Sequence, residues 1–129
     1  MGAAPDHVTV LAVDDQDVFR VVLRELIAAT PGFEQTGEAA SGSEAIARAA
    51  EIEPDLVLLD VRMPGMDGIE TAQRLSESAR PPLVVLISLD ATAAPTSDCG
   101  AAAFVCKQDL STASLRAIWA AHSRSRDPA

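Results

Sequence analysis

Five short segments of the chain have the hydrophobic pattern of β-strands, and they alternate with segments whose apolar residues recur at helical spacing. The strand segments are residues 8–13, 34–39, 55–60, 83–87 and 101–106. Most of them are continuous apolar runs, which are typical of strands buried on both faces of a parallel sheet. The alternation therefore predicts a single α/β domain with a parallel sheet, helices on both faces and right-handed crossovers.

The segment after the first strand has its apolar residues at the spacing of an amphipathic helix. The residues expected on its buried face are Val18, Phe19, Val22, Leu23, Leu26 and Ile27. A Ser-Gly-Ser-Glu sequence at residues 41–44 has the form of a capping box, in which the Ser hydroxyl and the Glu carboxylate satisfy each other's free backbone N–H groups. It predicts the start of the next helix.

The sequence signals for the remaining helices differ in strength. Asp67 and Glu70 predict the capped start of a third helix, and a last helix is expected from about Ser111 to His122. Between the fourth and fifth strands, residues 89–100 contain a proline and several turn-forming residues. We expect at most a turn or two of helix there, so the fourth helix of the alternation should be short or irregular.

Composition narrows the class of protein. With 129 residues, the chain can form one domain whose core needs neither disulfides nor a structural metal. The formal net charge of −9 argues against binding to nucleic acid or to an anionic membrane. No apolar run approaches the roughly 20 residues that span a bilayer, and no signal peptide is recognisable, so we expect a cytoplasmic protein. Residues 7–122 should form the domain, with disordered tails at 1–6 and 123–129.

Polar residues stand at the ends of four predicted strands. They are Asp14 and Asp15 after the first strand, Asp60 after the third, Ser88 after the fourth and Lys107 after the fifth. Because parallel strands end at the same edge of a sheet, these side chains are expected to meet there. Any one of them is explained as a solvated strand end, but three acids, a hydroxyl and an amine together form a workable chemical site.

Three neighbouring carboxylates repel one another, and a hard divalent cation is the natural counter-charge. Mg²⁺ suits such a site because it binds a few carboxylate oxygens and keeps several waters. A carboxylate such as Asp60 that faces Mg²⁺, a Lys ammonium and a hydroxyl is equipped to attack phosphorus and form an acyl phosphate. The cation and the ammonium would neutralise charge on the transferred oxygens.

These motifs resemble the receiver domain of bacterial two-component response regulators, from about His7 to His122. The motifs that carry the resemblance are the acidic pair Asp14-Asp15, the stretch Asp60-Val61-Arg62-Met63-Pro64-Gly65-Met66-Asp67-Gly68, Ser88, and Lys107 preceded by Phe104. The resemblance implies a flavodoxin-like, doubly wound five-stranded sheet in the order 2-1-3-4-5.

By the same resemblance, Asp60 is the phosphoacceptor and Mg²⁺ is the cofactor. Asp15 would bind Mg²⁺ directly, Asp14 directly or through water, and the backbone carbonyl of Arg62 would complete the protein ligands together with Asp60. Lys107 would contact the phosphoryl group.

Four further assignments concern the response to phosphorylation. Ser88 would hydrogen-bond the phosphoryl group once it has formed, and Phe104 would turn inward as Ser88 moves, which is the family's switch. Arg62 and Asp90, each two residues past a site residue, would tune how long the phosphoryl group lasts. For these two, ordinary loop charge is the simpler interpretation.

The resemblance implies a single-domain response regulator. Such a protein accepts a phosphoryl group from a sensor histidine kinase or a histidine phosphotransfer protein and signals to a downstream protein target by contact. We expect a monomer or weak dimer that binds neither nucleic acid nor membrane. It would not be an enzyme, although it would assist its own phosphorylation and slow dephosphorylation.

Two departures from the family leave alternatives open. The stretch from Ser88 to Lys107 is roughly three residues shorter than expected and carries Pro95, which allows a degenerate receiver that serves only as a docking module. The chain also stops a few residues after the last helix, whereas many relatives continue into a DNA-binding domain. A receiver fragment of a DNA-binding transcriptional regulator is therefore the other alternative.

Two more distant classes use a similar nucleophile or sheet. Phosphatases with an aspartate nucleophile place a second Asp two residues later, but Arg62 occupies that position here. Electron carriers of the flavodoxin type need a hydroxyl- and glycine-rich loop after the first strand, where residues 14–17, Asp-Asp-Gln-Asp, would repel a flavin phosphate. Steady hydrolysis of a phosphate monoester would favour the first class, and a yellow protein the second.

Overall fold

A computed structural model describes residues 7–95 and 98–123 of the 129-residue chain. Its centre is a five-stranded, all-parallel sheet in the order β2-β1-β3-β4-β5. The strands are β1 (Val8–Val13), β2 (Phe33–Ala39), β3 (Leu56–Asp60), β4 (Leu83–Ser88) and β5 (Ala103–Cys106). This arrangement confirms the predicted doubly wound, flavodoxin-like sheet and its strand order.

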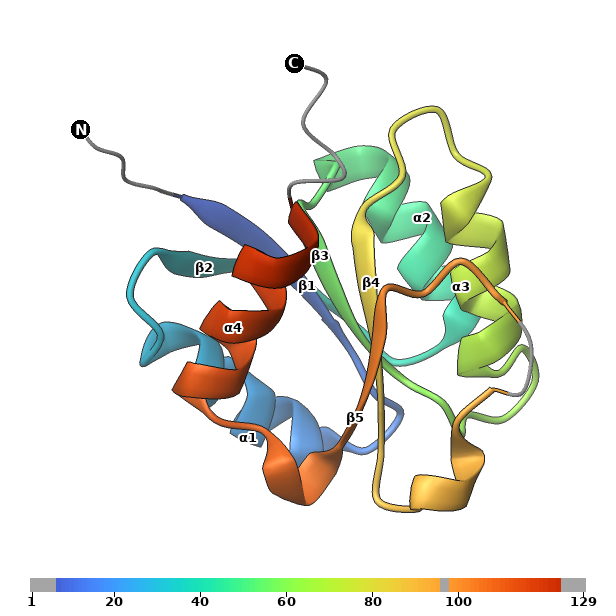
Figure 1. Ribbon diagram of the computed structural model, residues 1–129. Helices are drawn as coiled ribbons and strands as arrows, with labels where there is room; N and C mark the ends of the chain where they lie inside the picture. The colour runs from blue at the N-terminus through green and yellow to red at the C-terminus, as the bar shows by residue number, and fades with distance from the viewer. Residues whose placement is uncertain (1–6, 96–97, 124–129) are drawn as a thin grey trace.

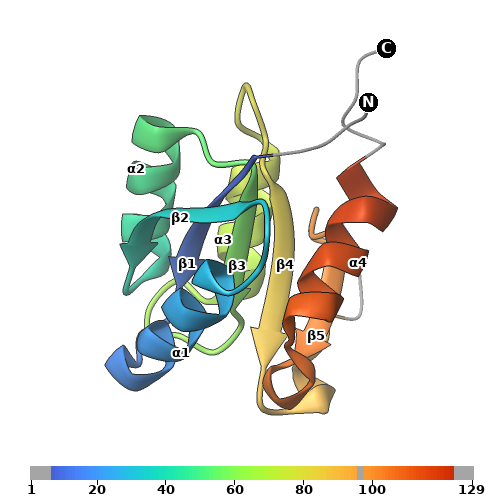
Figure 2. The same ribbon diagram turned by 90° about the vertical axis from the view of Figure 1, so that its left-hand side faces the viewer.

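Helices cover both faces of the sheet (Figures 1 and 2). They are α1 (Asp17–Ala28), α2 (Gly42–Ile52), α3 (Gly68–Ser76) and α4 (Thr112–His122), together with the short 3₁₀ turns η1 (Ala91–Ala93) and η2 (Lys107–Asp109). Side chains of α1 and α4 pack against one face of the strands, and those of α2 and α3 pack against the other. The core therefore consists of two mainly aliphatic layers separated by the sheet.

The central strands β3 and β4 are buried along their whole length, whereas the edge strands β2 and β5 are mostly partly exposed. Helices lie over both faces of β3 and β4 and a strand lies on either side, which explains their continuous apolar sequences. Asp60 and Ser88 end these two strands, and both are buried with them. The ends of these two strands thus place a carboxylate and a hydroxyl in the buried interior.

The predicted buried face of α1 was too wide. The residues that pack into the core are Phe19, Leu23, Leu26 and Ile27. Val18 and Val22 were also expected there, but they are 79% and 45% exposed. A helix on a sheet buries a narrow stripe, and each valine lies one residue, about 100° around the helix axis, away from that stripe. α1 therefore presents an apolar strip to solvent beside its packed face.

Side-chain caps start α2 and α3 where the sequence predicted. The Ser41 hydroxyl accepts a hydrogen bond from the Glu44 N–H at 3.1 Å. The Glu44 carboxylate, however, accepts from the N–H of Ala40 at 2.7 Å, one residue before the expected partner. The Asp67 carboxylate accepts from the Glu70 N–H at 2.9 Å. The capping-box prediction is therefore only half right, while the cap of α3 is confirmed.

The connection between β4 and β5 contains the three-residue turn η1, capped by Asp90, which confirms the expected short fourth helix. The last helix of the sequence is therefore α4. The tails expected at 1–6 and 124–129 lie outside the described residues, while Ser123, expected to begin the second tail, is the C-cap of α4. Within residues 7–95 and 98–123, no helix combines the length and apolar character needed to cross a bilayer.

Candidate functional site

The carboxyl ends of the strands meet at one edge of the sheet, the lower edge in Figures 1 and 2. Asp14 directly follows β1, Asp60 ends β3, Ser88 ends β4, and Lys107 directly follows β5. The register pairs Ser88 with Cys106, the residue before Lys107, so these strand ends lie level with each other. Parallel strands in register thus bring together the polar residues that are far apart in the sequence.

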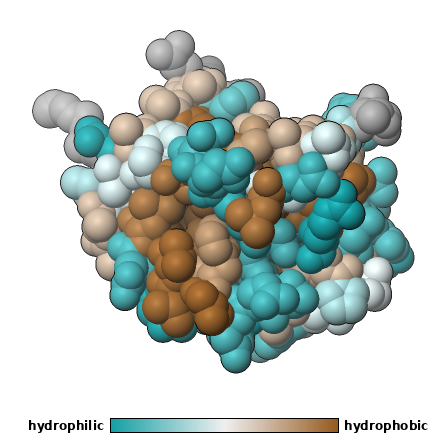
Figure 3. Space-filling model, turned by 90° about the horizontal axis from the view of Figure 1, so that it is seen from below, coloured by the Kyte–Doolittle hydropathy of each residue, from teal (hydrophilic) through white to brown (hydrophobic). Residues whose placement is uncertain are grey.

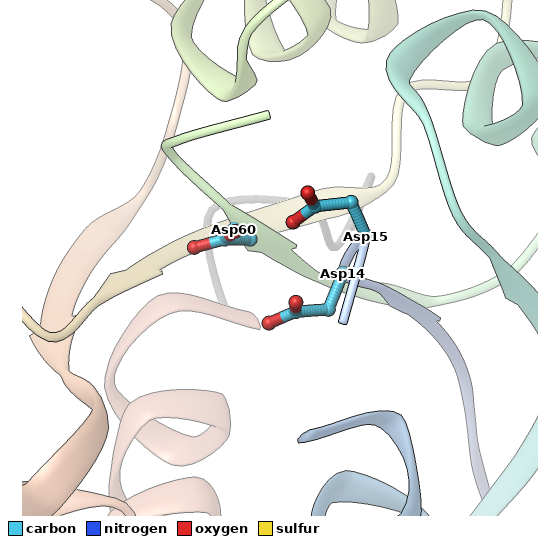
Figure 4. Close-up of side chains that lie close together, drawn as sticks. All are labelled: Asp14, Asp15 and Asp60. Carbon is cyan, nitrogen blue, oxygen red and sulfur yellow. The ribbon is translucent and has the colours of Figure 1, made fainter. Parts of the chain in front are cut away.

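Three carboxylates form a cluster at this edge (Figure 4). Asp14, Asp15 and Asp60 each offer one oxygen, and these oxygens all lie within 4.8 Å of one another. Asp14 is completely buried, Asp60 is nearly so, and Asp15 is partly exposed. In the part of the chain that the structure describes, no group donates a hydrogen bond to the Asp15 carboxylate. Its oxygens are therefore available to a cation.

The Lys107 ammonium supplies a positive charge within the cluster. Its Nζ lies 2.7 Å from Asp14 Oδ2 and 3.4 Å from Asp60 Oδ1, and the side chain is only 7% exposed. The same Nζ lies 4.1 Å from the centroid of the Phe19 ring, a cation–π contact contributed by α1. Two carboxylates and one aromatic ring therefore hold the ammonium beside Asp60, where it can meet an incoming anion.

Burial, followed by the negative charge of Asp14, raises the pKa of Asp60 from its usual 3.8 to about 6. Both effects disfavour the ionised carboxylate. The Lys107 ammonium acts in the opposite direction, and Asp15 adds a smaller repulsion. Three acids against one ammonium leave excess negative charge, so the cluster gains from a further cation.

The cluster has the donor set of a hard divalent cation. Asp14 Oδ2 is fully buried, and its partner is the Lys107 ammonium at 2.7 Å, which also lies near Asp60. Three neighbouring carboxylates that share a single ammonium suit a further cation that prefers oxygen ligands. Asp14, Asp15 and Asp60 therefore fit Mg²⁺, and the contribution expected from the Arg62 carbonyl stays a prediction.

Ser88 and Phe104, the predicted switch pair, lie on neighbouring strands and on the same face of the sheet, because Phe104 pairs with Leu86, two residues before Ser88. Ser88 is buried, and its Oγ accepts a hydrogen bond from the Asp90 N–H at 3.1 Å. Phe104 is partly buried against the core layer under α2 and α3. A hollow of about 200 Å³ borders its ring.

Arg62 and Asp90, the predicted tuning residues, form an ion pair at this edge, with Arg62 Nη2 3.0 Å from Asp90 Oδ2. Asp90 also accepts hydrogen bonds from the hydroxyl and the N–H of Thr92, and these bonds, more than Arg62, lower the pKa of Asp90. Solvent screens an exposed pair of this kind, so it contributes little to stability. Its structural effect is to join the loop after β3 to the loop after β4.

Two residues in the first turn of α1 reach the cluster without having been assigned to it from the sequence. Phe19 was expected only as a core residue, but its ring contacts the Lys107 ammonium. Arg20 was not singled out, yet its Nη1 donates to the backbone carbonyl of Asp14 at 2.5 Å. The usable signal was their position: a helix that begins three residues after Asp14 starts at the same sheet edge.

Residues 10–118 match the family described as the response regulator receiver domain. The chain is 38% identical over 117 residues to the transcriptional regulatory protein LiaR of Bacillus subtilis, covering 88% of this chain and 56% of LiaR. It is also 38% identical over 81 residues to the nitrate/nitrite response regulator protein NarL of Escherichia coli K12, covering 63% of this chain and 38% of NarL. The chain thus spans about half of LiaR and a smaller share of NarL.

Solved structures share the fold. The response regulator domain of Thermotoga maritima CheB matches with a TM-score of 0.71 and 30% identity, over 93% of this chain and 94% of that one. The signal receiver domain of the putative response regulator NarL from Mycobacterium tuberculosis matches with a TM-score of 0.75 and 30% identity, over 88% and 98% of the two chains. The similarity therefore extends over the whole fold and is not confined to the acidic edge.

Proposed function

Because the chain belongs to the response regulator receiver domain family of two-component systems, we propose that it accepts a phosphoryl group on Asp60. The donor is a sensor histidine kinase or a histidine phosphotransfer protein, the cofactor is Mg²⁺, and the phosphorylated protein signals by contact with a downstream protein. The observation that carries the proposal is the Lys107 ammonium, 2.7 Å from Asp14 and 3.4 Å from Asp60 in an otherwise acidic cluster.

In the transfer, an Asp60 carboxylate oxygen attacks phosphorus in line with the P–N bond of the donor phosphohistidine. The new O–P bond makes an acyl phosphate, and the electron pair of the broken P–N bond stays on the histidine nitrogen. Lys107, already 3.4 Å from Asp60, meets the phosphoryl oxygens and offsets their charge. When bound at the three carboxylates, Mg²⁺ supplies further charge neutralisation.

Ser88 is the group that responds to the new phosphate. Its hydroxyl now accepts from the Asp90 N–H, and in the phosphorylated protein it would donate to a phosphoryl oxygen on Asp60 at the end of the neighbouring strand. If the Ser88 hydroxyl moves toward the phosphate, the Asp90 N–H next to η1 loses its acceptor and space opens on the face that Phe104 shares. We propose this exchange as the link between the charge on Asp60 and the partner surface.

The protein acts as a stoichiometric phosphoacceptor and not as a turnover enzyme. Rapid hydrolysis needs a second carboxylate that can act as a general base on water, and the position two residues after Asp60 holds Arg62 instead. Arg62 is paired with Asp90 at the same edge. We propose that this pair tunes the slow loss of the phosphoryl group.

The surface of α1 suits contact with the phosphodonor. Val18, Val21 and Val22 on this helix are all exposed, and Val18 follows the acidic pair by only three residues. Figure 3, which views the molecule from below, shows apolar residues gathered among hydrophilic ones on that face. A donor that brings its phosphohistidine to Asp60 covers this edge of the sheet, so the valines can pack against it.

A second candidate is the receiver portion of a DNA-binding transcriptional regulator. It is favoured by the similarity to LiaR, a transcriptional regulatory protein of which the match covers 56%. The chemistry at Asp60 would be the same, but the downstream target would be a domain of the same protein. In either case we propose a cytoplasmic protein that is a monomer or weak dimer.

Labelling by acetyl phosphate tests the phosphoacceptor directly. With Mg²⁺, the wild-type protein should gain one phosphoryl group by intact-mass spectrometry, and EDTA should abolish the labelling. Asp60→Asn should gain none, because the nucleophilic oxygen is replaced by an amide. Asp109→Asn is the matched control, since Asp109 is exposed and lies outside the acidic cluster, and it should be labelled like the wild type.

Labelling of Asp60→Asn at the wild-type rate would remove Asp60 from the role. Wild-type protein that takes up no phosphoryl group from acetyl phosphate or from a phosphorylated histidine kinase would refute the proposal as a whole. That second result would favour the docking-module alternative.

A further inference from the structure

We propose that Arg20 is a positioning residue that fixes the peptide between Asp14 and Asp15 and so aims the acidic pair at the divalent cation. The inference deepens the proposed function and rests on it for the presence of the cation. It is carried by the contacts of Arg20 itself, by the surroundings of Asp14, and by the anchoring of the guanidinium on β2.

Arg20 reaches three acceptors from the first turn of α1. Its Nη1 donates to the backbone carbonyl of Asp14 at 2.5 Å, its guanidinium pairs with Asp17, and its Nε lies 3.4 Å from Glu38 Oε1. The side chain is only 17% exposed although it is charged. A planar guanidinium can serve several acceptors in fixed directions at once, whereas a lysine ammonium is a compact point charge.

Each polar atom of Asp14 lies against a specific group. Its N–H donates to the Ala39 carbonyl at 3.1 Å, Oδ1 accepts from the Gln16 N–H at 2.9 Å, and Oδ2 lies 2.7 Å from Lys107 Nζ. Arg20 provides the remaining contact, to the carbonyl oxygen. The backbone and the side chain of Asp14 are therefore both held in place.

The carbonyl that Arg20 holds belongs to the planar peptide group that joins Asp14 to Asp15. Because that group is rigid, its orientation fixes the positions of the Asp15 N and Cα, from which the Asp15 side chain starts. Within the described residues, nothing donates a hydrogen bond to the Asp15 carboxylate itself. The direction of this carboxylate thus depends on the backbone that Arg20 holds.

Glu38 anchors this arrangement from β2. Its carboxylate accepts hydrogen bonds from Arg24 and from Gln35 at 2.7 Å each. The bond from Arg24 is the largest cause that holds the pKa of Glu38 below its usual range, so Glu38 stays ionised. Arg24 and Arg20 share this carboxylate, but among the described contacts only Arg20 also touches the acidic pair.

Whether loss of Arg20 weakens or tightens Mg²⁺ binding distinguishes a positioning role of Arg20 from an effect of its charge. A cation beside the acidic pair repels Mg²⁺, so loss of Arg20 would tighten Mg²⁺ binding if Arg20 acted through its charge alone. Loss of a residue that orients metal ligands has the opposite sign and typically costs roughly 10–100-fold in affinity. We expect Arg20→Ala to bind Mg²⁺ about tenfold more weakly.

Isothermal titration calorimetry of the 129-residue chain with MgCl₂ measures the Mg²⁺ dissociation constant without any phosphorylation step. Arg20→Lys should also bind more weakly, because lysine keeps the charge but cannot span the three acceptors. Arg24→Ala is the matched control: it removes the same charge from the same Glu38 and leaves the Asp14 carbonyl contact intact. It should stay within about twofold of the wild type, and circular dichroism should show that each variant is folded.

Unchanged or tighter Mg²⁺ binding by folded Arg20→Ala overturns the inference, and so does an equal loss in Arg24→Ala. If Arg20→Ala does not fold, Arg20→Lys decides, and wild-type affinity in that variant overturns the inference equally. A wild-type protein that binds no Mg²⁺ overturns the proposed function and this inference together. Normal Mg²⁺ binding by both wild type and Arg20→Ala overturns this inference alone.

Discussion

Asp60 carries the charge that the fold accommodates least easily. It ends a fully buried strand, and its neighbours include one ammonium, Lys107, but two further acids, Asp14 and Asp15. An ionised carboxylate in that position is reactive because water and hydrogen-bond donors do not stabilise it as they do at the surface. The same features that support the proposed attack of Asp60 on phosphorus therefore lower the stability of the metal-free protein at neutral pH.

In metal-free buffer, Asp60→Asn should stabilise the protein fully at pH 8 and only about half as much at pH 5. The pKa of Asp60 is about 6 in the folded protein against its usual 3.8, so the folded state holds the proton more tightly. The resulting stabilisation is complete below pH 3.8 and is lost progressively as the pH rises to about 6. One pKa unit corresponds to about 1.4 kcal/mol, so the gain at pH 8 is at most about 3 kcal/mol.

Urea unfolding of both proteins in EDTA, from pH 5 to pH 8, measures this gain. The difference in the free energy of unfolding should grow with pH, mostly between pH 5 and 7. A difference that is constant over this range would contradict the raised pKa of Asp60.

At the scale of elements, α1 and the β4–β5 connection determine what surrounds the site. In the first turn of α1, Phe19 contacts the Lys107 ammonium and Arg20 donates a hydrogen bond to the Asp14 carbonyl. This helix therefore contacts the residues of the site as well as the core. Among its described residues, the connection after β4 contains only the turn η1 as helical structure, and an open hollow of about 550 Å³ lies between that turn and the loop after β3. A partner can therefore approach the loop that follows Asp60.

The close contact between α3 and the end of β3 predicts the effect of Gly68→Ala. A Cβ at Gly68 would lie 2.3 Å from the Asp60 carbonyl oxygen, so the backbone of the site has to shift. Helix propensity alone favours Ala by about 1 kcal/mol, but the overlap should outweigh it and lower the free energy of unfolding by roughly 1–3 kcal/mol. Labelling of Asp60 by acetyl phosphate should also slow several-fold.

Gly65→Ala is the control for this prediction. Gly65 has φ +76° and no atom within 4 Å of an added Cβ. Its substitution should cost roughly 1–2 kcal/mol through the left-handed backbone alone and leave the labelling rate unchanged. Stabilisation by Gly68→Ala, measured by urea unfolding, would show that the propensity effect prevails.

At the scale of the whole molecule, the parallel sheet gathers groups from distant parts of the chain, and binding at their meeting point is coupled to folding. The unfolded chain separates Asp15 from Asp60 by dozens of residues, so a cation held by both stabilises only the folded protein. The formal charge of −9 adds a general repulsion that any salt relieves. A specific cation effect has to be distinguished from this screening.

Mg²⁺ at ten times its dissociation constant should stabilise the protein by about 1.4 kcal/mol, which raises the melting temperature by roughly 3–5 °C. NaCl at equal ionic strength should produce a smaller shift, because it only screens charge. Asp15→Asn should abolish the difference between the two salts, since it removes one carboxylate of the cluster. Differential scanning calorimetry measures these shifts in melting temperature. Equal shifts by both salts in the wild type would argue against a specific cation site.

Local patterns in the sequence predicted the strands, their order along the chain and the short η1 segment. They failed where packing overrules periodicity. Val18 and Val22 fit an apolar helix face, but α1 buries only the narrower stripe that meets the sheet. Glu44 fits a capping box, but its carboxylate reaches Ala40. Both errors are small, because each one concerns adjacent residues of a single element.

By itself the sequence determined the alternation of strands and helices, because hydrophobic period, caps and breakers act over a few residues. It thereby identified the strand-end residues of the site, Asp14, Asp15, Asp60, Ser88 and Lys107. The tertiary structure alone decided the contacts among them and the groups that hold them, such as Lys107 against Phe19 and Arg20 against the Asp14 carbonyl. These contacts depend on how α1 packs against the sheet edge, a relation between distant segments that no local pattern encodes.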